Sequence, residues 1–213
     1  MTYPSRASKN LEEWVPKTRL GKMILEGRIT SIEEIFMEGL QIREPQIVDA
    51  LLPDLQEEVI DINLVQKQTD AGEISRFKAI VAVGNRDGYI GLGFGKTKQV
   101  RAAIEKAAVN ARLNIVPVRR GCGSWECGCG KFHSVPFKIE GKCGGVRIVI
   151  LPGPRGLGIV ASEVAKVILA LAGIKDCWTR SYGSTRTIPS FAYAIFDTLK
   201  KTYSLTTPTD WVR

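Results

Sequence analysis

In the middle of the chain, the order of apolar and polar residues predicts an antiparallel sheet with one helix on it. From Glu58 the pattern becomes that of a strand, because Ile60, Ile62 and Leu64 alternate with Asp61 and Asn63 before the polar Gln66–Gln68. Alternation returns over Arg76–Gly84, which is typical of a half-buried strand. Asn85–Gly88 ends in Asp-Gly, which supplies the positive φ angles of a tight turn. A returning strand starts at Tyr89, and the spacing of apolar residues over Thr97–Leu113 predicts an amphipathic helix.

A second run of elements follows a stretch that is rich in glycine and cysteine. The pattern predicts two strands, then a helix closed by Gly173, a short strand through Trp178 and a final helix. The two strands are expected at Ser134–Glu140 and Val146–Leu151. The first helix is expected at Ala161–Ala172 and the final helix at Ser190–Lys200.

The first part of the chain shows weaker periodicity. The weak periodicity of residues 1 to about 30 predicts an extended arm that becomes ordered on a partner. Ser31 and Glu34 have the spacing of a capping box, and Pro45 suits the first turn of a second short helix that ends near Leu52. The acidic outer faces of these helices indicate a solvated surface, contact with a basic protein or docking of the helices.

Glycines at 91, 93 and 95 leave one face of the returning strand without side chains. Something must approach this backbone closely, and we expect it to be RNA backbone. The segment does not match the nucleotide loops, because position 90 is Ile where a P-loop needs Gly, and position 96 is Lys where a dinucleotide fingerprint needs Gly. Polymeric phosphate is the better fit, since lysine and arginine crowd the first turns of the following helix.

Charge is strongly segregated along the chain. The formal net charge is +8 and the pI is near 9.3, which points toward a polyanion. From Ser31 to Leu64 there are nine acidic residues and one basic residue, whereas from Val65 to Arg120 there are eleven basic and four acidic residues. The two regions therefore face different partners.

The chain has no apolar run long enough to cross a bilayer and no signal-peptide core, so we expect a cytoplasmic protein without membrane contact. Its five cysteines, an odd number, argue against a disulfide framework. Cys143 and Cys177 lie among apolar or glycine neighbours and are expected to be core thiols.

The other three cysteines and the only histidine, which are Cys122, Cys127, Cys129 and His133, lie within twelve residues. Four such ligands suit a closed tetrahedral zinc site of structural type, although the C-x-C pair is not a standard knuckle spacing. The alternative is a reduced, exposed loop. No catalytic combination of residues is recognisable elsewhere, so we expect the chain not to be an enzyme.

Several long motifs resemble the ribosomal protein S5 family of the small subunit, in its archaeal form. They are RFKAIVAVGNRDGYIGLGFGKTKQVRAAIEKAAVNA, LNIVPVRRG, HSVPFKIEGKCGG, LPGPRGLGIV and VAKVILALAGIKDCWT, with EEWVPKTRLGKMILEGRITSIEEIF before them. The resemblance covers nearly all of the chain. It implies an α+β fold, in which a double-stranded-RNA-binding-like domain with a three-stranded antiparallel sheet and a helix precedes a second small α/β domain with a βαβ crossover.

The expected domain organisation combines this resemblance with the pattern. Residues 1–57 form an N-terminal extension with short helices, and residues 58–118 form the RNA-binding domain. Residues 119–133 are a linker that includes the predicted zinc loop. The second domain covers residues 134–203, and a tail covers residues 204–213.

The resemblance also implies a function. It implies a ribosome-bound protein that binds small-subunit rRNA and the neighbouring proteins of the fourth and eighth small-subunit families. It further implies a position near the mRNA entry channel and an influence on decoding accuracy. A free regulator that binds double-stranded RNA is the alternative, since one fold hosts many functions.

Basic residues in segments that expose backbone are the expected RNA contacts, chiefly to phosphate. With the two glycines they are Arg76, Lys78, Arg86, Gly91, Gly93, Lys96, Lys98, Arg101, Arg119, Arg120, Lys131 and Arg155.

Overall fold

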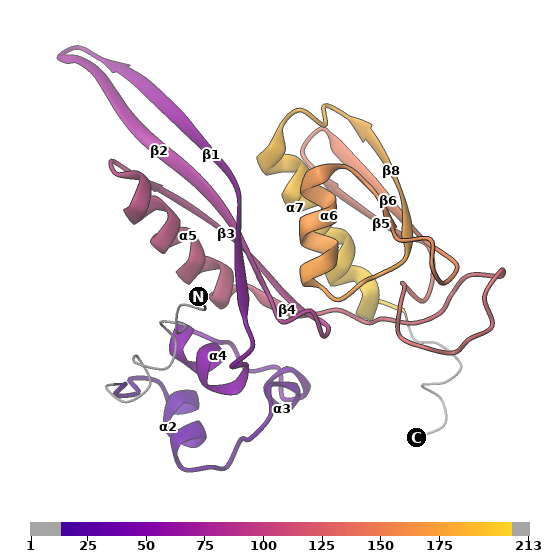
Figure 1. Cartoon of the computed structure of the whole chain (residues 1–213). Helices are drawn as coiled ribbons and strands as arrows, with labels where there is room; N and C mark the ends of the chain where they lie inside the picture. The colour runs from indigo at the N-terminus through magenta and orange to yellow at the C-terminus, as the bar shows by residue number, and fades with distance from the viewer. Residues whose placement is uncertain (1–13, 206–213) are drawn as a thin grey trace, which may run out of the picture. The chain divides into compact units, whose positions relative to one another are not determined.

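A computed structural model of the chain describes residues 14–205 of its 213 residues (Figure 1). These residues form two compact units, one ending at Leu55 and the other beginning at Gln56. Each unit is described by itself. Within residues 14–205, no helix combines the length and the apolar character needed to cross a membrane.

The first unit contains three short helices around a small apolar cluster. They are α2 (Arg19–Leu25), α3 (Ile32–Met37) and α4 (Pro45–Leu51). The two predicted helices, α3 and α4, are confirmed. The Ser31 hydroxyl accepts a hydrogen bond from the Glu34 backbone N–H, and Pro45 occupies the first turn of α4. The capping interactions anticipated from the sequence therefore set the start of both helices.

Helix α2 contradicts the prediction of an extended arm through residue 30. The Thr18 side chain caps the helix by accepting from the Gly21 N–H. Leu20 and Ile29 are buried against Ile35 and Ile47, so this segment is ordered by its own apolar residues. The start of the predicted arm, residues 1–13, lies outside the described residues.

Glu44 ties the start of α4 to the segment before α2. Its carboxylate accepts hydrogen bonds from Trp14 Nε1 at 2.9 Å, from the Lys17 N–H at 2.9 Å and from the Thr18 N–H at 2.6 Å. Burial alone would raise the pKa of Glu44, but the hydrogen bonds that it accepts outweigh burial and hold this pKa below its ordinary value. The ionised carboxylate therefore stabilises the unit.

The second unit begins with a sheet of four antiparallel strands, one more than expected. The order is β1-β2-β3-β4, from β1 (Gln56–Thr69), β2 (Gly72–Gly84), β3 (Tyr89–Thr97) and the short β4 (Ile115–Pro117). Strands β1 and β2 are longer than predicted and form one hairpin. Pairing of β2 with β3 ends at Phe77, so the rest of the hairpin projects as a two-stranded ribbon (Figure 1).

Helix α5 (Val100–Leu113) lies on the glycine face of β3. A Cβ atom at Gly91, Gly93 or Gly95 would come within 2.0–2.2 Å of a carbonyl oxygen of α5. The three carbonyls belong to Ala111, Ala107 and Ala103. The glycines recur at every second residue of β3, and the carbonyls that face them recur at every fourth residue of α5. These spacings match, because two residues of a strand advance about 6.6 Å and four residues of a helix advance about 6.0 Å.

This contact shows that the expectation of RNA against the glycine face was wrong. The glycines are needed for close approach of a backbone, as predicted, but the backbone is that of α5. Gly91 and Gly93 are buried in the protein and are removed from the candidate RNA contacts.

The second domain has a mixed sheet with two helices on one of its faces (Figure 1). The strand order is β5-β6-β8-β7, from β5 (Ile139–Cys143), β6 (Val146–Pro152), β7 (Ile159–Val160) and β8 (Cys177–Gly183). Helix α6 (Glu163–Leu171) connects the parallel pair β7 and β8, which confirms the βαβ crossover. Helix α7 (Ile188–Lys200) packs on β5 and β6 and is followed by the 3₁₀ turn η1 (Lys201–Tyr203).

The predicted strand at Ser134–Glu140 is only partly correct. Strand β5 starts at Ile139, because Ser134 is used earlier, in an isolated bridge to Gly121. Strand β7 was not predicted, and at two residues it is too short for a pattern of alternation to show it.

The two domains of this unit share one core. Ile80 and Leu92 from the first sheet are in the same buried cluster as Ile168 and Leu171 from α6. The Leu171 carbonyl also accepts a hydrogen bond of 2.9 Å from the Arg86 N–H. Strand β2 is consequently buried on both faces from Ala79 to Gly84, and the prediction of a half-buried strand is wrong for that half.

We expect Gly93→Ala to destabilise the second unit by at least about 3 kcal/mol, because the added carbon would meet helix backbone that cannot move aside. Its nearest atoms would be Ala107 O at 2.0 Å and Ala111 N at 2.2 Å. The matched control is Gly145→Ala, where a Cβ would have open space and which should change stability by less than about 0.5 kcal/mol. Urea unfolding of the full chain, followed by circular dichroism, measures both. Equal stability of the two variants would contradict the packing argument.

We expect the first unit to lose stability as the pH falls below about 4.3, the ordinary pKa of a glutamate. Because the folded-state pKa of Glu44 is lowered, its contribution is complete above that pH and is lost as the pH falls through the lowered pKa. The hydrogen-exchange protection factors of the Lys22 and Leu40 amides, which donate to the Thr18 and Ile35 carbonyls, should fall over this range in the parent. Glu44→Gln should show fast exchange already at pH 7, whereas Glu38→Gln, at an exposed position, should behave like the parent. An unchanged Glu44→Gln profile would refute the proposed role of the carboxylate.

Candidate nucleic-acid interface and metal centre

The face of the first sheet opposite α5 changes character along its length. Residues directly opposite on neighbouring strands point to the same side, and Lys78 pairs with Lys96 while Ile80 pairs with Phe94. Ile80 belongs to the shared core. Toward the start of β2, the next residues on the same face are Lys78 and then the exposed Arg76. The core therefore ends where the basic residues begin.

Five of the predicted contacts gather at this uncovered end of the domain. We call them the distal basic group, which consists of Arg76, Lys78, Lys96, Lys98 and Arg101. All but the half-buried Lys78 are exposed. Arg101 also forms an exposed ion pair with Glu105 at 3.3 Å, one helical turn away. Like charges placed opposite each other, as in Lys78 and Lys96, cost stability unless an anion lies nearby.

Phe94 lies among these cations and was not predicted as a contact. Its side chain is 37% exposed, and Lys78 Nζ lies 5.2 Å from the centre of its ring. An aromatic ring beside phosphate-binding cations suits RNA, since bases stack on such rings. The available signal was an aromatic residue two positions before Lys96, but a phenylalanine in a strand is more often part of a core.

The arginines near the junction of the two domains make contacts within the protein. The Arg120 guanidinium donates to the side chain and to the carbonyl of Asp87 in the β2–β3 turn. The Arg119 N–H donates to Thr202 Oγ1 at 3.0 Å. Arg86 has a φ of 56°, which is unusual for a residue other than glycine, and its side chain is exposed. Their binding to RNA stays a prediction.

A second group of cations surrounds a concavity of the second domain. Lys131, Arg155 and Lys175 line it together with Phe132 and Asp176. Lys131 and Arg155 were predicted separately, and the structure brings them together. Lys175 was missed, because it stands alone in the sequence between a glycine turn and β8.

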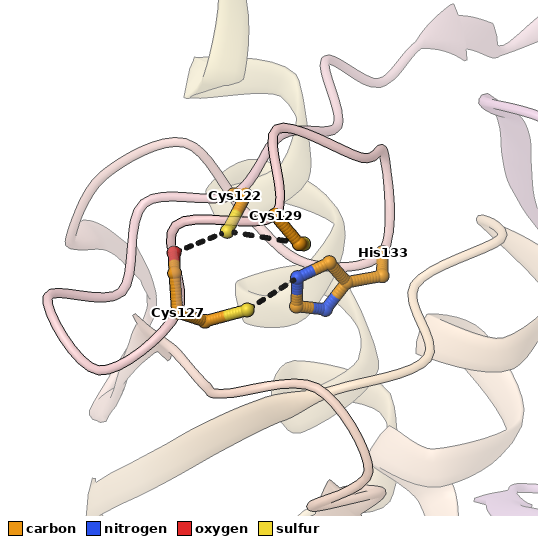
Figure 2. Close-up of side chains that lie close together, drawn as sticks. All are labelled: Cys122, Cys127, Cys129 and His133. Atoms are coloured by element: carbon orange, nitrogen blue, oxygen red, sulfur yellow. Dashed lines mark hydrogen bonds between the residues drawn. The ribbon is translucent and has the colours of Figure 1, made fainter.

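The four predicted metal ligands converge on one point (Figure 2). Their candidate donor atoms, three sulfurs and one imidazole nitrogen, all lie within 4.8 Å of one another. The sulfurs of Cys122 and Cys129 are 3.6 Å apart, and Cys127 Sγ lies 3.8 Å from His133 Nε2. Cys122 also donates to the Cys127 carbonyl at 2.8 Å.

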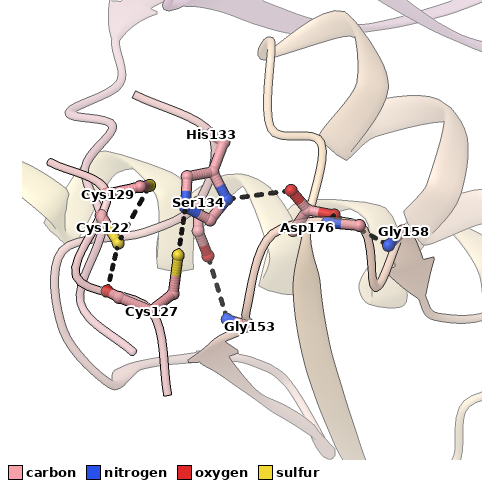
Figure 3. A network of polar contacts seen from close by, with 9 residues as sticks. Cys122, Cys127, Cys129, His133, Ser134, Gly153, Gly158 and Asp176 are labelled. Carbon is pink, nitrogen blue, oxygen red and sulfur yellow. Dashed lines mark hydrogen bonds and ion pairs between the residues drawn. The ribbon is translucent and has the colours of Figure 1, made fainter. Parts of the chain in front are cut away.

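His133 is held from its other side by a buried carboxylate (Figure 3). Its Nδ1 lies 2.9 Å from Asp176 Oδ2, and both side chains are less than a tenth exposed. The other oxygen of Asp176 accepts from the N–H groups of Gly156 and Gly158 at 3.1 and 2.8 Å. Asp176 thus links the histidine to the turn before β7.

The environments of the cysteines differ. Backbone N–H groups of Arg155 and Cys129 lower the pKa of Cys127 to about 6, whereas burial raises the pKa of Cys122. Burial raises the pKa of Cys177 to about 12, as expected for the core thiol that was predicted there. Cys143 is only half-buried at the edge of the core, so the prediction of a core thiol is weaker for this residue.

Comparison with known proteins gives the same picture over both domains. The family profile described as ribosomal protein S5, N-terminal domain, matches residues 55–119, and the profile of the C-terminal domain matches residues 141–209. The chain belongs to the ribosomal protein S5 family. This membership confirms the α+β fold class and the expectation that the chain is not an enzyme.

Relatives from archaea match almost end to end. The small ribosomal subunit protein uS5 of Ignicoccus hospitalis is 58% identical over 202 residues, which cover 95% of this chain and 96% of that protein. The protein of the same name from Aeropyrum pernix is 58% identical over 211 residues, covering 99% and 97%. That of Thermofilum pendens is 57% identical over 199 residues, covering 93% and 98%. The archaeal form of the family is therefore the one that this chain represents.

Proposed function

We propose that the chain is a structural constituent of the small ribosomal subunit and binds small-subunit rRNA through the distal basic group. The observation that carries this proposal is the end of the first sheet beyond the shared core, where Lys78 and Lys96 face each other beside the exposed Phe94 ring and where Lys98 and Arg101 are exposed at the start of α5. Such a surface binds a polyanion with accessible bases better than a small anion. The archaeal relatives are named as proteins of the small subunit, which supports the same function.

The concavity lined by Lys131, Arg155 and Lys175 is the second proposed contact with rRNA. Because the two domains share one core, the first sheet and this concavity belong to one compact unit. Two basic sites on such a unit can fix the relative position of two RNA segments, since phosphate contacts position a protein without reading sequence.

The proposed partners include proteins of the fourth and eighth small-subunit families, with the mRNA entry channel nearby and an influence on decoding accuracy. This part of the proposal rests on the family resemblance. The acidic region from Ser31 to Leu64 supports protein contacts, because an acidic surface avoids RNA and attracts basic proteins. Within the second unit, the exposed Val59 and Leu64 on β1 offer apolar area for a contact with a protein.

Sedimentation of a lysate from an archaeal host that expresses the tagged chain tests the function. A constituent of the subunit co-sediments with small subunits and stays there after a high-salt wash. A free regulator that binds double-stranded RNA would stay near the top of the gradient, and that result would refute the proposal.

Changing Lys96, Lys98 and Arg101 together to Ala should reduce the slope of log affinity against log salt by roughly 2 to 3, since each phosphate contact on a duplex contributes about 0.9. Filter binding of the purified chain to a small-subunit rRNA fragment, over a range of KCl concentrations, gives the slope.

The control changes Lys142, Lys166 and Lys200 to Ala, because these exposed lysines of the second domain remove the same charge away from the distal basic group. A slope that changes equally in both triple variants would mean that net charge, rather than this surface, sets the affinity.

A further inference from the structure

We propose that Cys122, Cys127, Cys129 and His133 bind one zinc ion, and that Asp176 is the carboxylate that orients the histidine ligand. The proposal rests on the geometry of these five side chains and does not depend on the proposed function. It adds a metal site to a fold that is otherwise held by apolar cores.

The donor atoms have the spacing of a tetrahedral site. A zinc ion with Zn–S bonds of about 2.3 Å and a Zn–N bond of about 2.0 Å sets distances of about 3.6–3.8 Å between its ligand atoms. The observed separations are 3.6 Å between Cys122 Sγ and Cys129 Sγ, and 3.8 Å between Cys127 Sγ and His133 Nε2. All four candidate donor atoms lie within 4.8 Å of one another, which is about 1 Å more than the ligand spacing of a bound zinc ion.

A disulfide does not account for this arrangement. It would use two of the three sulfurs and would leave the third cysteine and the imidazole nitrogen pointing to the same place without a reason (Figure 2). Three thiolates with one imidazole are the ligand set of a closed structural zinc site, in which no position is left for a reactive water.

The loop that carries the ligands has little apolar packing of its own. Its two large apolar side chains, Trp125 and Phe132, are 93% and 70% exposed. Its ends are joined by the bridge between Gly121 and Ser134, with hydrogen bonds of 2.8 and 2.9 Å. Between these ends the chain must be ordered against its conformational entropy, and metal coordination supplies the interaction that burial does not.

Asp176 prepares the histidine for a metal. A carboxylate accepts only, so the proton of a neutral His133 imidazole stands on Nδ1, which leaves the lone pair of Nε2 directed at the cysteines (Figure 3). Gly156 and Gly158 hold Asp176 in turn. The ion would therefore connect the loop to the turn before β7 and keep Lys131 beside Arg155.

Metal analysis of the full chain, purified without chelator, tests the site. We expect about one equivalent of zinc in the parent, less than about a tenth in the Cys127→Ser, Cys129→Ser variant, and about one in the Cys143→Ser control, since structural sites retain their ion on dilution. Cys143 is a suitable control because it lies outside the cluster. Less than about a tenth of an equivalent in the parent, iron in place of zinc, or a Cys122–Cys129 disulfide in its mass spectrum would overturn the proposal.

Two further measurements test the site without the Cys127→Ser, Cys129→Ser variant, so they do not depend on whether that variant folds. Removing zinc from the parent with a chelator should accelerate hydrogen exchange at Gly156 and Gly158 but not in β2. Asp176→Asn should weaken zinc binding by 10- to 100-fold in a chelator competition, because the amide would favour the tautomer with the proton on Nε2. Unchanged exchange on chelation would refute the link to the turn, and an unchanged affinity would refute the role of Asp176.

Discussion

Strands β2 and β3 are buried on both faces over the same part of their length. The packing of the second unit depends on this burial. On one face, α5 comes so close that the strand must carry glycine where its side chains would point at the helix. On the other face, Ile80 and Leu92 join the core of the second domain. Close packing of this kind leaves few alternatives, since added volume at a backbone contact cannot be accommodated by side-chain rotation. The two domains are therefore halves of one core.

The same constraint explains where the basic residues stand. Charged side chains are rarely buried without a partner, because desolvation of an ion is costly. Along β2, the residues of one face change from Ile80 to Lys78 and Arg76 where the second domain no longer covers the sheet. The cations of the distal basic group thus occupy the part of the sheet that the described residues of the second unit leave exposed, where a nucleic acid can approach.

The loop between the domains follows different physical rules. It has too few buried residues to be ordered by the hydrophobic effect, and it is instead closed by a bridge at its base and by side chains that converge at its centre. Asp176 connects that centre to backbone N–H groups of a second turn. A polar network of this kind positions cations such as Lys131 and Arg155 without a core beneath them.

Most helices and strands of this protein, and its candidate chemistry, can be recognised from local patterns in the sequence. Alternation and capping signals located the longer strands and the helices α3 to α7, but not the short strands β4 and β7, and the crossover was implied by the family resemblance. Residue type with spacing selected the Cys and His cluster and the basic residues. These features are local, so a single sequence displays them. The helix α2 was also signalled locally, by Thr18 and Leu20, but the prolines and glycines around it favoured an extended arm.

What covers each surface depends on how the helices and strands pack, which the sequence does not display. The glycines of β3 required a close neighbour, and nothing in their spacing distinguished RNA from α5, which arrives from later in the chain. The burial of both faces of β2, the pairing of Arg120 with Asp87, and the placement of Lys175 and Asp176 beside the loop are likewise contacts between distant segments. Such contacts depend on how the elements pack, because a strand or loop has the same local pattern whichever partner covers it.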